Sequence, residues 1–373
     1  MGNGTQERIH VGTRKGLFTL ERGADGWGIA AAEHLGDPVV IVAHDARDDT
    51  LYAALDHGHF GAKLHRRPAA GGDWEEIAVP VYPEKSEGVE DKDGFGAEIP
   101  WTLKLIWAVV PGHATQPGRL WCGTLPGGLF RSDDRGDSWH LVQSLWDHPD
   151  RKEWFGGGAN WPGIHSVLVH PDKPEQVAVG LSCGGVWISE DDGGSWACRS
   201  EGMRAEFVPP ERVMDPRIQD PHCVVQCPGS PDHWWTQHHN GIFRSTDGSR
   251  SWHEIEGVQP SAFGFPVAVH PTEPDTAWFV PGIKDETRYP VDAQLVVTRT
   301  RDGGQSFDVL RDGLPQSHAY DVVLRHALDI DAAGDGLAFG STTGNVYVSE
   351  DQGDHWACVS TSLPPVYCVR YAK

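Results

Sequence analysis

The chain has 373 residues, a formal net charge of −22 at pH 7 and an isoelectric point near 5.2. Such an acidic surface repels the phosphates of nucleic acids and of anionic membranes, so we expect neither as a partner. No apolar run approaches membrane-spanning length, and no apolar signal-peptide core follows Met1, which predicts a soluble, cytoplasmic protein. The seven cysteines include no CxxC pair, which favours reduced thiols over a disulfide framework.

The composition indicates an all-β protein. The 45 glycines, 27 prolines and 16 tryptophans suit many short strands joined by tight turns, and no long helical periodicity is found. The length exceeds that of a usual single hydrophobic core, so the chain is expected to add core by repeating a unit. We therefore predict one repeat domain over residues 1–373.

Strand-like segments recur in the same order along the chain. Alternating apolar stretches such as TLYAAL (50–55), RLWCGT (119–124) and QVAVGL (176–181) are each followed by a segment that begins with glycine, such as GLFRS (128–132) and GVWIS (185–189). Segments such as SVLVHP (166–171) and PVAVHP (266–271) precede them and end in a His-Pro turn. Each unit thus supplies a first, second and third strand before its turn.

The turn after the third strand has a repeated pattern. A hydroxyl residue is followed by Asp two positions later, Gly two after that and an aromatic residue three further on. The copies are SDDRGDSW (132–139), SEDDGGSW (189–196), STDGSRSW (245–252, with Ser249 at the Gly position), TRDGGQSF (300–307) and SEDQGDHW (349–356). Asp and Gly at these positions are typical of a hairpin turn, so the Asp residues are predicted to be structural.

The five copies resemble the Asp-box (BNR) repeat β-propellers, a superfamily that includes sialidases, sortilin-type receptors, some glycoside hydrolases and a photosystem assembly factor. Degenerate copies that end at Trp27 and Trp74 bring the total to seven units. The resemblance implies a seven-bladed β-propeller with four strands in each blade. The three arginines and the RIP-type motif of sialidases are not recognisable, so we do not expect a sialidase.

The two ends of the chain are predicted to share one blade. The segments IHVGTR (9–14) and KGLFTL (15–20) match second and third strands, and no first strand precedes them. The last strand-like segment, VYCVRYA (366–372), matches a first strand. The C-terminal strand is therefore expected to complete the N-terminal blade and close the ring, which removes an exposed sheet edge.

Long insertions are expected to open on one face of the ring and to carry the function. They span residues 80–102, 143–164, 200–221, 281–292 and 311–319. Alignment of the units places His165 and His222 at the same end of the first strand, with Asp321 beside Tyr320 at that point of the seventh unit. Alignment on the third-strand glycine adds His57, His59, His238 and His239. His326 is placed at the opposite face, in a structural role.

Imidazoles from neighbouring blades can form a metal site without a local motif. We predict catalytic roles for His165, His222, His239, Tyr320 and Asp321, with His165, His222, His239 and His59 as ligands of a divalent metal ion; the same groups could act without metal. Aromatic and basic groups suited to a sugar or an acid are predicted to bind substrate, namely Trp101, Trp161, His57, His238 and Arg14.

Two functions remain open at this point. The first is an enzyme, a hydrolase or lyase, whose loop-rich face binds a small polar ligand such as a carbohydrate or a hydroxylated or aromatic acid. The second is a non-catalytic scaffold, for which the acidic, Trp-rich loops form a protein interface. Convergent histidines favour the enzyme, whereas the lack of a recognisable catalytic carboxylate pair favours the scaffold. No sequence feature indicates an oligomeric state.

Overall fold

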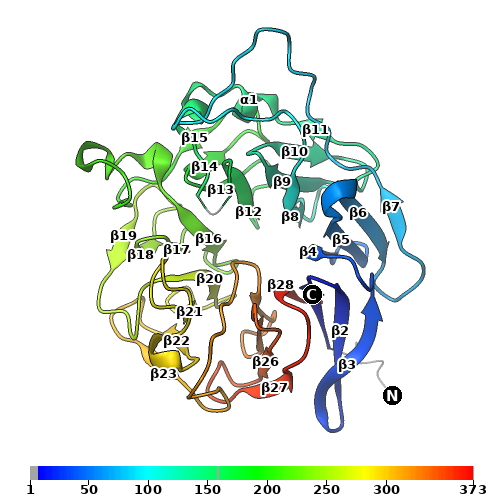
Figure 1. Cartoon of the computed structure of the whole chain (residues 1–373), viewed down its shortest axis with the longest axis vertical. Helices are drawn as coiled ribbons and strands as arrows, with labels where there is room; N and C mark the ends of the chain where they lie inside the picture. The colour runs from blue at the N-terminus through cyan, green and yellow to red at the C-terminus, as the bar shows by residue number, and fades with distance from the viewer. Residues whose placement is uncertain (1–6, 158, 373) are drawn as a thin grey trace.

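The computed structural model describes residues 7–157 and 159–372; residues 1–6, which the signal-peptide expectation concerns in part, lie outside it, as do Gly158 and Lys373. Seven four-stranded antiparallel sheets form a ring, as Figure 1 shows. The predicted all-β, seven-bladed propeller is therefore confirmed. Within the described ranges, no helix has the length and apolar character needed to cross a membrane.

The strands of the first four blades are given from the centre of the ring outward. Blade one consists of β28 (Val366–Tyr371), β1 (Arg8–Thr13), β2 (Gly16–Gly23) and β3 (Gly26–Glu33). Blade two consists of β4 (Val39–Asp45), β5 (Thr50–Asp56), β6 (Ala62–Pro68) and β7 (Glu75–Ile77). Blade three consists of β8 (Leu105–Pro111), β9 (Leu120–Leu125), β10 (Leu129–Ser132) and β11 (His140–Leu141). Blade four consists of β12 (Gly163–Val169), β13 (Val177–Ser182), β14 (Gly185–Ser189) and β15 (Ala197–Cys198).

The other three blades follow the same order. Blade five consists of β16 (Pro221–Gln226), β17 (Trp234–His238), β18 (Gly241–Ser245) and β19 (His253–Ile255). Blade six consists of β20 (Gly264–Val269), β21 (Ala277–Pro281), β22 (Val297–Thr300) and β23 (Asp308–Leu310). Blade seven consists of β24 (Leu328–Ile330), β25 (Leu337–Gly340), β26 (Val346–Ser349) and β27 (Ala357–Ser360).

Helical turns occur only in the connections of the described chain. The α-helix α1 (Gln143–Trp146) and the 3₁₀ turn η2 (Pro149–Glu153) lie between blades three and four. The other 3₁₀ turns are η1 (Gly58–Phe60), η3 (Pro210–Arg212), η4 (Pro216–Ile218) and η5 (Val291–Ala293). All five 3₁₀ turns begin at or next to proline or glycine, which is consistent with short connections and not with packed helices.

The ring is closed by the C-terminal strand. β28 pairs antiparallel with β1, from Ile9 opposite Tyr371 to Thr13 opposite Val366. The innermost strands of successive blades pack against one another around the ring, from β28 and β4 through to β24 and β28. The predicted completion of the N-terminal blade by residues 366–372 is confirmed.

Each repeated turn is organised around its carboxylate. In blade four, the Ser189 hydroxyl accepts the N–H of Gly193 (2.8 Å) and donates to Asp191 Oδ1 (2.8 Å). The Asp191 carboxylate also accepts the N–H (2.8 Å) and the hydroxyl (2.7 Å) of Ser195. These hydrogen bonds, first of all that from the Ser195 hydroxyl, lower the pKa of Asp191. The other copies repeat the contacts at Asp134, Asp247, Asp302 and Asp351.

In several copies the closing tryptophan ties the turn to the preceding blade. Trp139 Nε1 donates to the carbonyl of Ala78 (2.9 Å), and Trp252 Nε1 donates to that of Arg199 (2.8 Å). Ser249 has φ of 65°, in the left-handed region that Gly193 adopts in its copy (87°). The Ser249 hydroxyl donates to the same Arg199 carbonyl (3.1 Å), which offsets part of the strain of that backbone conformation. The turn is thus a joint between blades as well as a hairpin.

Replacing the turn carboxylate should weaken the fold without changing the site. In the Asp191→Ala variant, the N–H and hydroxyl of Ser195 lose their acceptor. We expect the melting temperature to fall by about 2–4 °C, the effect of one lost hydrogen-bonded turn on a chain of this size. Thermal unfolding followed by circular dichroism measures this. The adjacent exposed residue supplies the control, Glu190→Ala; an unchanged melting temperature in Asp191→Ala together with lost ligand binding would contradict the structural role.

Removal of the closing strand should open the ring. A protein truncated after Pro365 lacks β28 and exposes the edge of β1. We expect it to aggregate or to unfold without cooperativity, while deletion of Lys373 alone has no such effect. Size-exclusion chromatography and thermal unfolding measure both. A soluble monomeric truncation with wild-type unfolding would show that closure is dispensable.

Candidate functional site

A bulge recurs near the start of six innermost strands. At that point one residue of the strand has no partner in the neighbouring strand, so that two residues oppose one. A bulge of this kind re-aims the extra side chain away from the plane of the ladder. The bulges fall at Val40, Trp107, His165, His222, Phe265–Pro266 and Tyr367. Five of these side chains, all except those of His165 and Pro266, line one cavity.

The cavity has a volume of about 1170 Å³ and receives residues from every blade. Three of the predicted insertions also line it, through Phe155, Gly157, Phe207, Asp285 and Arg288. The walls therefore combine aromatic rings with a small number of charged groups. A concave site of this size and composition is typical of small-ligand binding.

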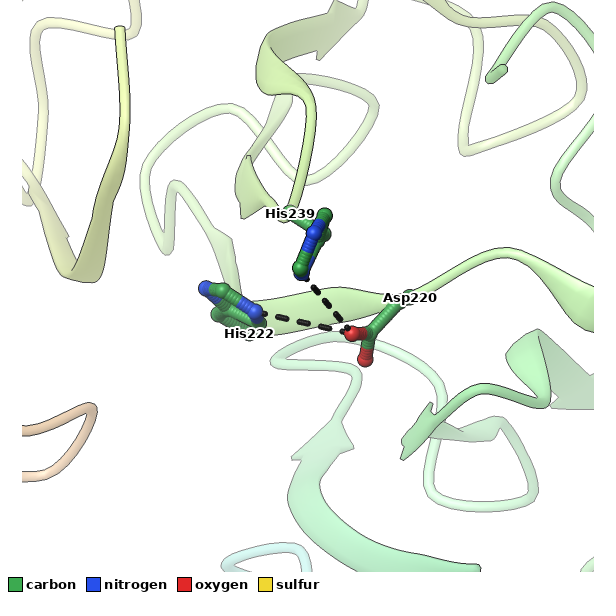
Figure 2. A group of neighbouring side chains, drawn as sticks. All are labelled: Asp220, His222 and His239. Carbon is green, nitrogen blue, oxygen red and sulfur yellow. Dashed lines mark ion pairs between the residues drawn. The ribbon is translucent and has the colours of Figure 1, made fainter. Parts of the chain in front are cut away.

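Asp220 and His222 lie at the start of β16, two residues apart, and face the same point. His222 Nε2 is 3.5 Å from Asp220 Oδ2, and both side chains are buried (Figure 2). His222 Nδ1 lies 2.7 Å from the carbonyl oxygen of Gly264. Because a carbonyl oxygen only accepts, Nδ1 carries the hydrogen, and in the neutral ring Nε2 is a bare acceptor. Two acceptors then face each other, an arrangement that only a cation or a proton between them stabilises.

His239 completes the cluster from the turn after β17. Its Nδ1 is also 3.5 Å from Asp220 Oδ2, as Figure 2 shows, and its backbone N–H donates to the Asp220 carbonyl (2.9 Å). Burial opposes the charged form of His239, but the Asp220 carboxylate outweighs it and raises the pKa of the ring. Burial likewise opposes the charged form of Asp220, yet His222 and His239 hold the pKa of this carboxyl well below its ordinary value.

The atoms that Asp220, His222 and His239 offer lie within 4.8 Å of one another. Ligand atoms roughly 2.0–2.2 Å from a tetrahedral metal ion are about 3.3–3.6 Å apart, which matches the two distances to Asp220. The Nδ1–H of His222 is held by a backbone carbonyl, the arrangement that orients ligating histidines in metalloproteins. Three protein ligands leave further positions for water or substrate. We name these three residues the Asp–His cluster.

Neighbouring groups hold the Asp–His cluster in place. The backbone N–H of Cys183, a residue with φ of 47°, donates to Asp220 Oδ1 (3.1 Å). Burial and the Asp220 charge raise the pKa of the Cys183 thiol. The backbone N–H of Asp220 donates to His238 Nε2 (3.0 Å), and burial lowers the pKa of His238 to about 3. The ring of Phe265 stacks on His222, with centroids 4.7 Å apart.

His222 and His239, which sequence alignment of the blades selects, are brought together, whereas His165 is not part of the cluster. The ring of His165 is buried; its Nδ1 contacts the Ser166 hydroxyl (3.0 Å), and its carbonyl accepts from His326 (2.8 Å). Burial lowers its pKa well below the ordinary value. Its Nε2 has no hydrogen-bond partner among the described residues. β12 has the same bulge as the other innermost strands, but the imidazole of His165 points into the protein and not into the cavity.

Tyr320, Asp321 and His59 also lie apart from the Asp–His cluster. The Asp321 carboxylate accepts hydrogen bonds from Ser341 (2.6 Å), Thr343 (2.6 Å) and Asn345 (2.7 Å), so its role here is to hold that turn. Tyr320 is exposed and contacts the ring of Tyr289, and His59 is exposed beside Phe60. None of the three is among the residues that line the cavity in the described part of the chain.

The predicted substrate-binding residues divide into two groups. Arg14 and His57 line the cavity, and His57 Nδ1 is 3.8 Å from Asp37. Trp101 and Trp161 instead anchor loops: their indole N–H groups donate to Asp91 (2.7 Å) and to the Glu98 carbonyl (2.9 Å). His238 is buried behind Asp220 and holds its backbone. Loop anchoring thus accounts for aromatic residues that composition alone cannot separate from ligand-binding ones.

Three cavity residues have roles that blade alignment does not reveal. Asp220 counts in the sequence only as one of many loop carboxylates, although its spacing of two from His222 at a strand start places both on one face. Arg325 lines the cavity, but no spacing marks it. His326 is expected at the opposite face, and that expectation is wrong, because it lines the cavity and donates to His165.

Comparison with known proteins supports the fold alone. No protein family and no curated protein matches the chain. Among solved structures, the GH74 xyloglucanase from Xanthomonas campestris is 19% identical with a TM-score of 0.61, over 96% of this chain and 51% of its own. A putative 6-phosphogluconolactonase from Bacteroides uniformis is 12% identical with a TM-score of 0.59, over 99% and 100%. A structure of YCF48 bound to D1 peptide is 12% identical with a TM-score of 0.52, over 86% and 82%.

The chain thus spans about half the length of the xyloglucanase and nearly all of the putative lactonase. At identities below 20%, the neighbours are as different as a xyloglucanase, a putative lactonase and a protein bound to a peptide. A shared fold therefore does not select a function, and the function has to be argued from the cavity. By its seven four-stranded blades and these neighbours, the chain is a seven-bladed β-propeller.

Proposed function

We propose that the protein is a metal-assisted hydrolase or lyase that binds a small hydroxylated ligand in the cavity. The Asp–His cluster of Asp220, His222 and His239 holds a divalent metal ion. The observation that carries this proposal is the geometry of His222: the Gly264 carbonyl accepts its Nδ1–H, and its Nε2 faces the Asp220 carboxylate across 3.5 Å. With His239, a divalent cation at that point would have three ligand atoms.

The chemistry of the cluster suits catalysis better than structural support. When bound, a divalent ion with open positions polarises a carbonyl or lowers the pKa of a bound water. The protein supplies two imidazoles and one carboxylate, and His239, with 21% of its side chain exposed, reaches the cavity. A structural metal site is usually closed by four protein ligands, whereas this cluster has three.

The cavity walls support a small polar ligand. Rings such as Trp107, Phe155 and Phe265 offer flat apolar faces, and His57 and Asp56 of blade two add polar groups. Sugars and hydroxylated acids combine an apolar face with many hydroxyl groups, so they fit walls of this kind. The structural neighbours that are a xyloglucanase and a putative lactonase are consistent with such ligands.

The repeated turns support membership of the Asp-box propellers. All five copies share the hydroxyl-to-N–H contact and the Asp-to-N–H contact described for Asp191. The turn carboxylates are engaged in these contacts, which leaves the cavity groups to perform the chemistry. We retain the cytoplasmic location as part of the proposal, since all seven cysteines are unpaired.

A second candidate function is a binding or assembly scaffold. Four aromatic side chains on the connections are exposed, namely Phe60 (78%), Phe95 (68%), Phe207 (38%) and Tyr320 (57%). Exposed aromatic side chains of this kind are enriched at protein interfaces. The neighbour YCF48 is described as bound to D1 peptide, which supports the same reading. The scaffold needs no metal, so metal content separates the two functions.

The first test is metal content. We expect the purified protein, loaded with Zn²⁺ or Mn²⁺ and then dialysed, to retain about one ion per chain, as a three-ligand site with ordered outer contacts does. Loss of one ligand in His222→Ala should weaken the affinity by more than about 100-fold. The control is His59→Ala, which removes an exposed histidine outside the cluster. Elemental analysis and circular dichroism on the same samples measure both; wild-type retention in His222→Ala would overturn the metal site.

The second test is activity. We expect the metal-loaded protein to turn over at least one member of a panel of lactones, aryl glycosides and uronides, and chelation to abolish this turnover. Asp220→Asn keeps the size of the side chain but removes its charge, so kcat/KM should fall by about 100-fold or more. Retained metal without any turnover in the panel would favour the scaffold. In that case, the binding of partner proteins would be measured with variants of the exposed aromatic residues, such as Phe207→Ala.

A further inference from the structure

Arg325 places a guanidinium group beside the Asp–His cluster. It lies just before β24, and its Nε donates to the backbone carbonyl of His222 (2.8 Å). The guanidinium stacks over the indole of Trp107, 4.4 Å from the ring centroid. One face and the Nε edge are therefore held by the protein. The remaining edge, with the two terminal nitrogens, is the part of Arg325 that is free to meet a ligand in the cavity.

The carboxylates that line the cavity have partners among the described residues, whereas Arg325 has no carboxylate partner there. Asp285 pairs with Arg288, and the Asp56 carboxylate accepts the N–H of Gly58 (3.0 Å). Asp37 faces His57, and Asp220 faces the two histidines of the cluster. Among the described residues, no carboxylate lies within ion-pair distance of Arg325.

Arg325 is half-buried, and a partly desolvated cation without a counterion is costly. Proteins seldom keep such a group unless a ligand or partner supplies the missing charge. A ligand anion in the cavity would satisfy both the charge and the two terminal nitrogens.

We infer that the ligand carries a carboxylate, which binds the free edge of Arg325. This inference rests on the proposed function for the position of the ligand. A guanidinium whose plane is fixed by stacking presents two parallel N–H donors, a geometry that matches the two oxygens of a carboxylate. Because Arg325 contacts the backbone of His222, whose ring belongs to the cluster, the carbon atoms next to the carboxylate lie close to Asp220 and His239. The ligand class is therefore a small hydroxy acid, such as an aldonic or uronic acid.

Exposed Arg14 also lines the cavity and has no ion pair among the described residues. A second cation in the neighbouring blade attracts an anionic ligand without fixing its orientation. Three arginines and four aspartates line the cavity, so a divalent ion in the cluster would make its formal charge positive on a protein whose net charge is −22. Such a change would favour entry of an acid.

The experiment compares two probes that differ only in the carboxylate. D-gluconate and sorbitol share one hydroxylated chain, and sorbitol replaces the carboxylate by a hydroxymethyl group. Isothermal titration calorimetry is performed on wild type, with Zn²⁺ bound and after chelation. We expect gluconate to bind at least tenfold more tightly than sorbitol, and Arg325→Gln to remove this preference while the metal content stays at the wild-type level. Arg325→Lys should keep part of the preference for gluconate, because the positive charge remains but the two parallel N–H donors are lost.

The control variant is Arg311→Gln. Arg311 is also without a carboxylate partner among the described residues, but it is exposed and contacts only Gln294 and Gln316 outside the cavity. It should keep the wild-type preference. The inference is overturned if wild type binds both probes equally or binds neither, if folded Arg325→Gln or Arg325→Lys with wild-type melting keeps the full preference, or if inorganic phosphate binds while gluconate does not. Failure of the proposed metal site alone gives a different result: the protein holds no metal, yet it still prefers gluconate after chelation.

Discussion

The pairing of β28 with β1 is the constraint on which the rest of the structure depends. The two strands lie at opposite ends of the chain, and their pairing places Tyr371 opposite Ile9. Without this pairing, the seven sheets form an open array with free edges at both ends. With it, the innermost strands surround one axis and the residues at their starts face a common space. The cavity is thus a property of closure and not of any single blade.

Closure also explains why bulges, and not regular strands, build the cavity. In a regular strand, successive side chains alternate between the two neighbouring blades, and both sets are buried in the packing between sheets. An unpaired residue breaks that alternation and points its side chain toward the axis. Trp107, His222 and Phe265 reach the cavity in this way. Six blades share this bulge, and the functional groups at the bulges differ because the side chains at that position differ.

The charges of the cavity are arranged as one system. The Asp220 carboxylate faces two imidazoles, and the backbone of one of them, His222, accepts the N–H of Arg325. A ligand that moves Arg325 would therefore also act on His222, which belongs to the Asp–His cluster. The burial that raises the cost of each isolated charge also strengthens every interaction between them. In the proposed complex, the Arg325 guanidinium would hold an anionic ligand within a propeller whose exterior is acidic.

The repeat signal in the sequence was sufficient for the architecture. The spacing of hydroxyl, Asp, Gly and aromatic residues reports local hydrogen bonds, such as those around Asp191, that form within eight residues. Short-range contacts of this kind are readable without tertiary structure, and so are the seven units and the role of residues 366–372. His222 and His239 could be selected because alignment of equivalent blades compares positions that share one local geometry.

The sequence could not decide which aligned residues point into the cavity. His165 and His222 occupy equivalent bulges, yet the ring of His165 is buried beside Ser166 and His326, whereas that of His222 turns toward Asp220. Side-chain direction depends on the neighbouring blades, which belong to segments more than 40 residues away, such as Gly264 for His222. Arg325 and Asp220 carry no repeat signal at all. Periodicity in the sequence determined the ring, and only packing across blades decided the site.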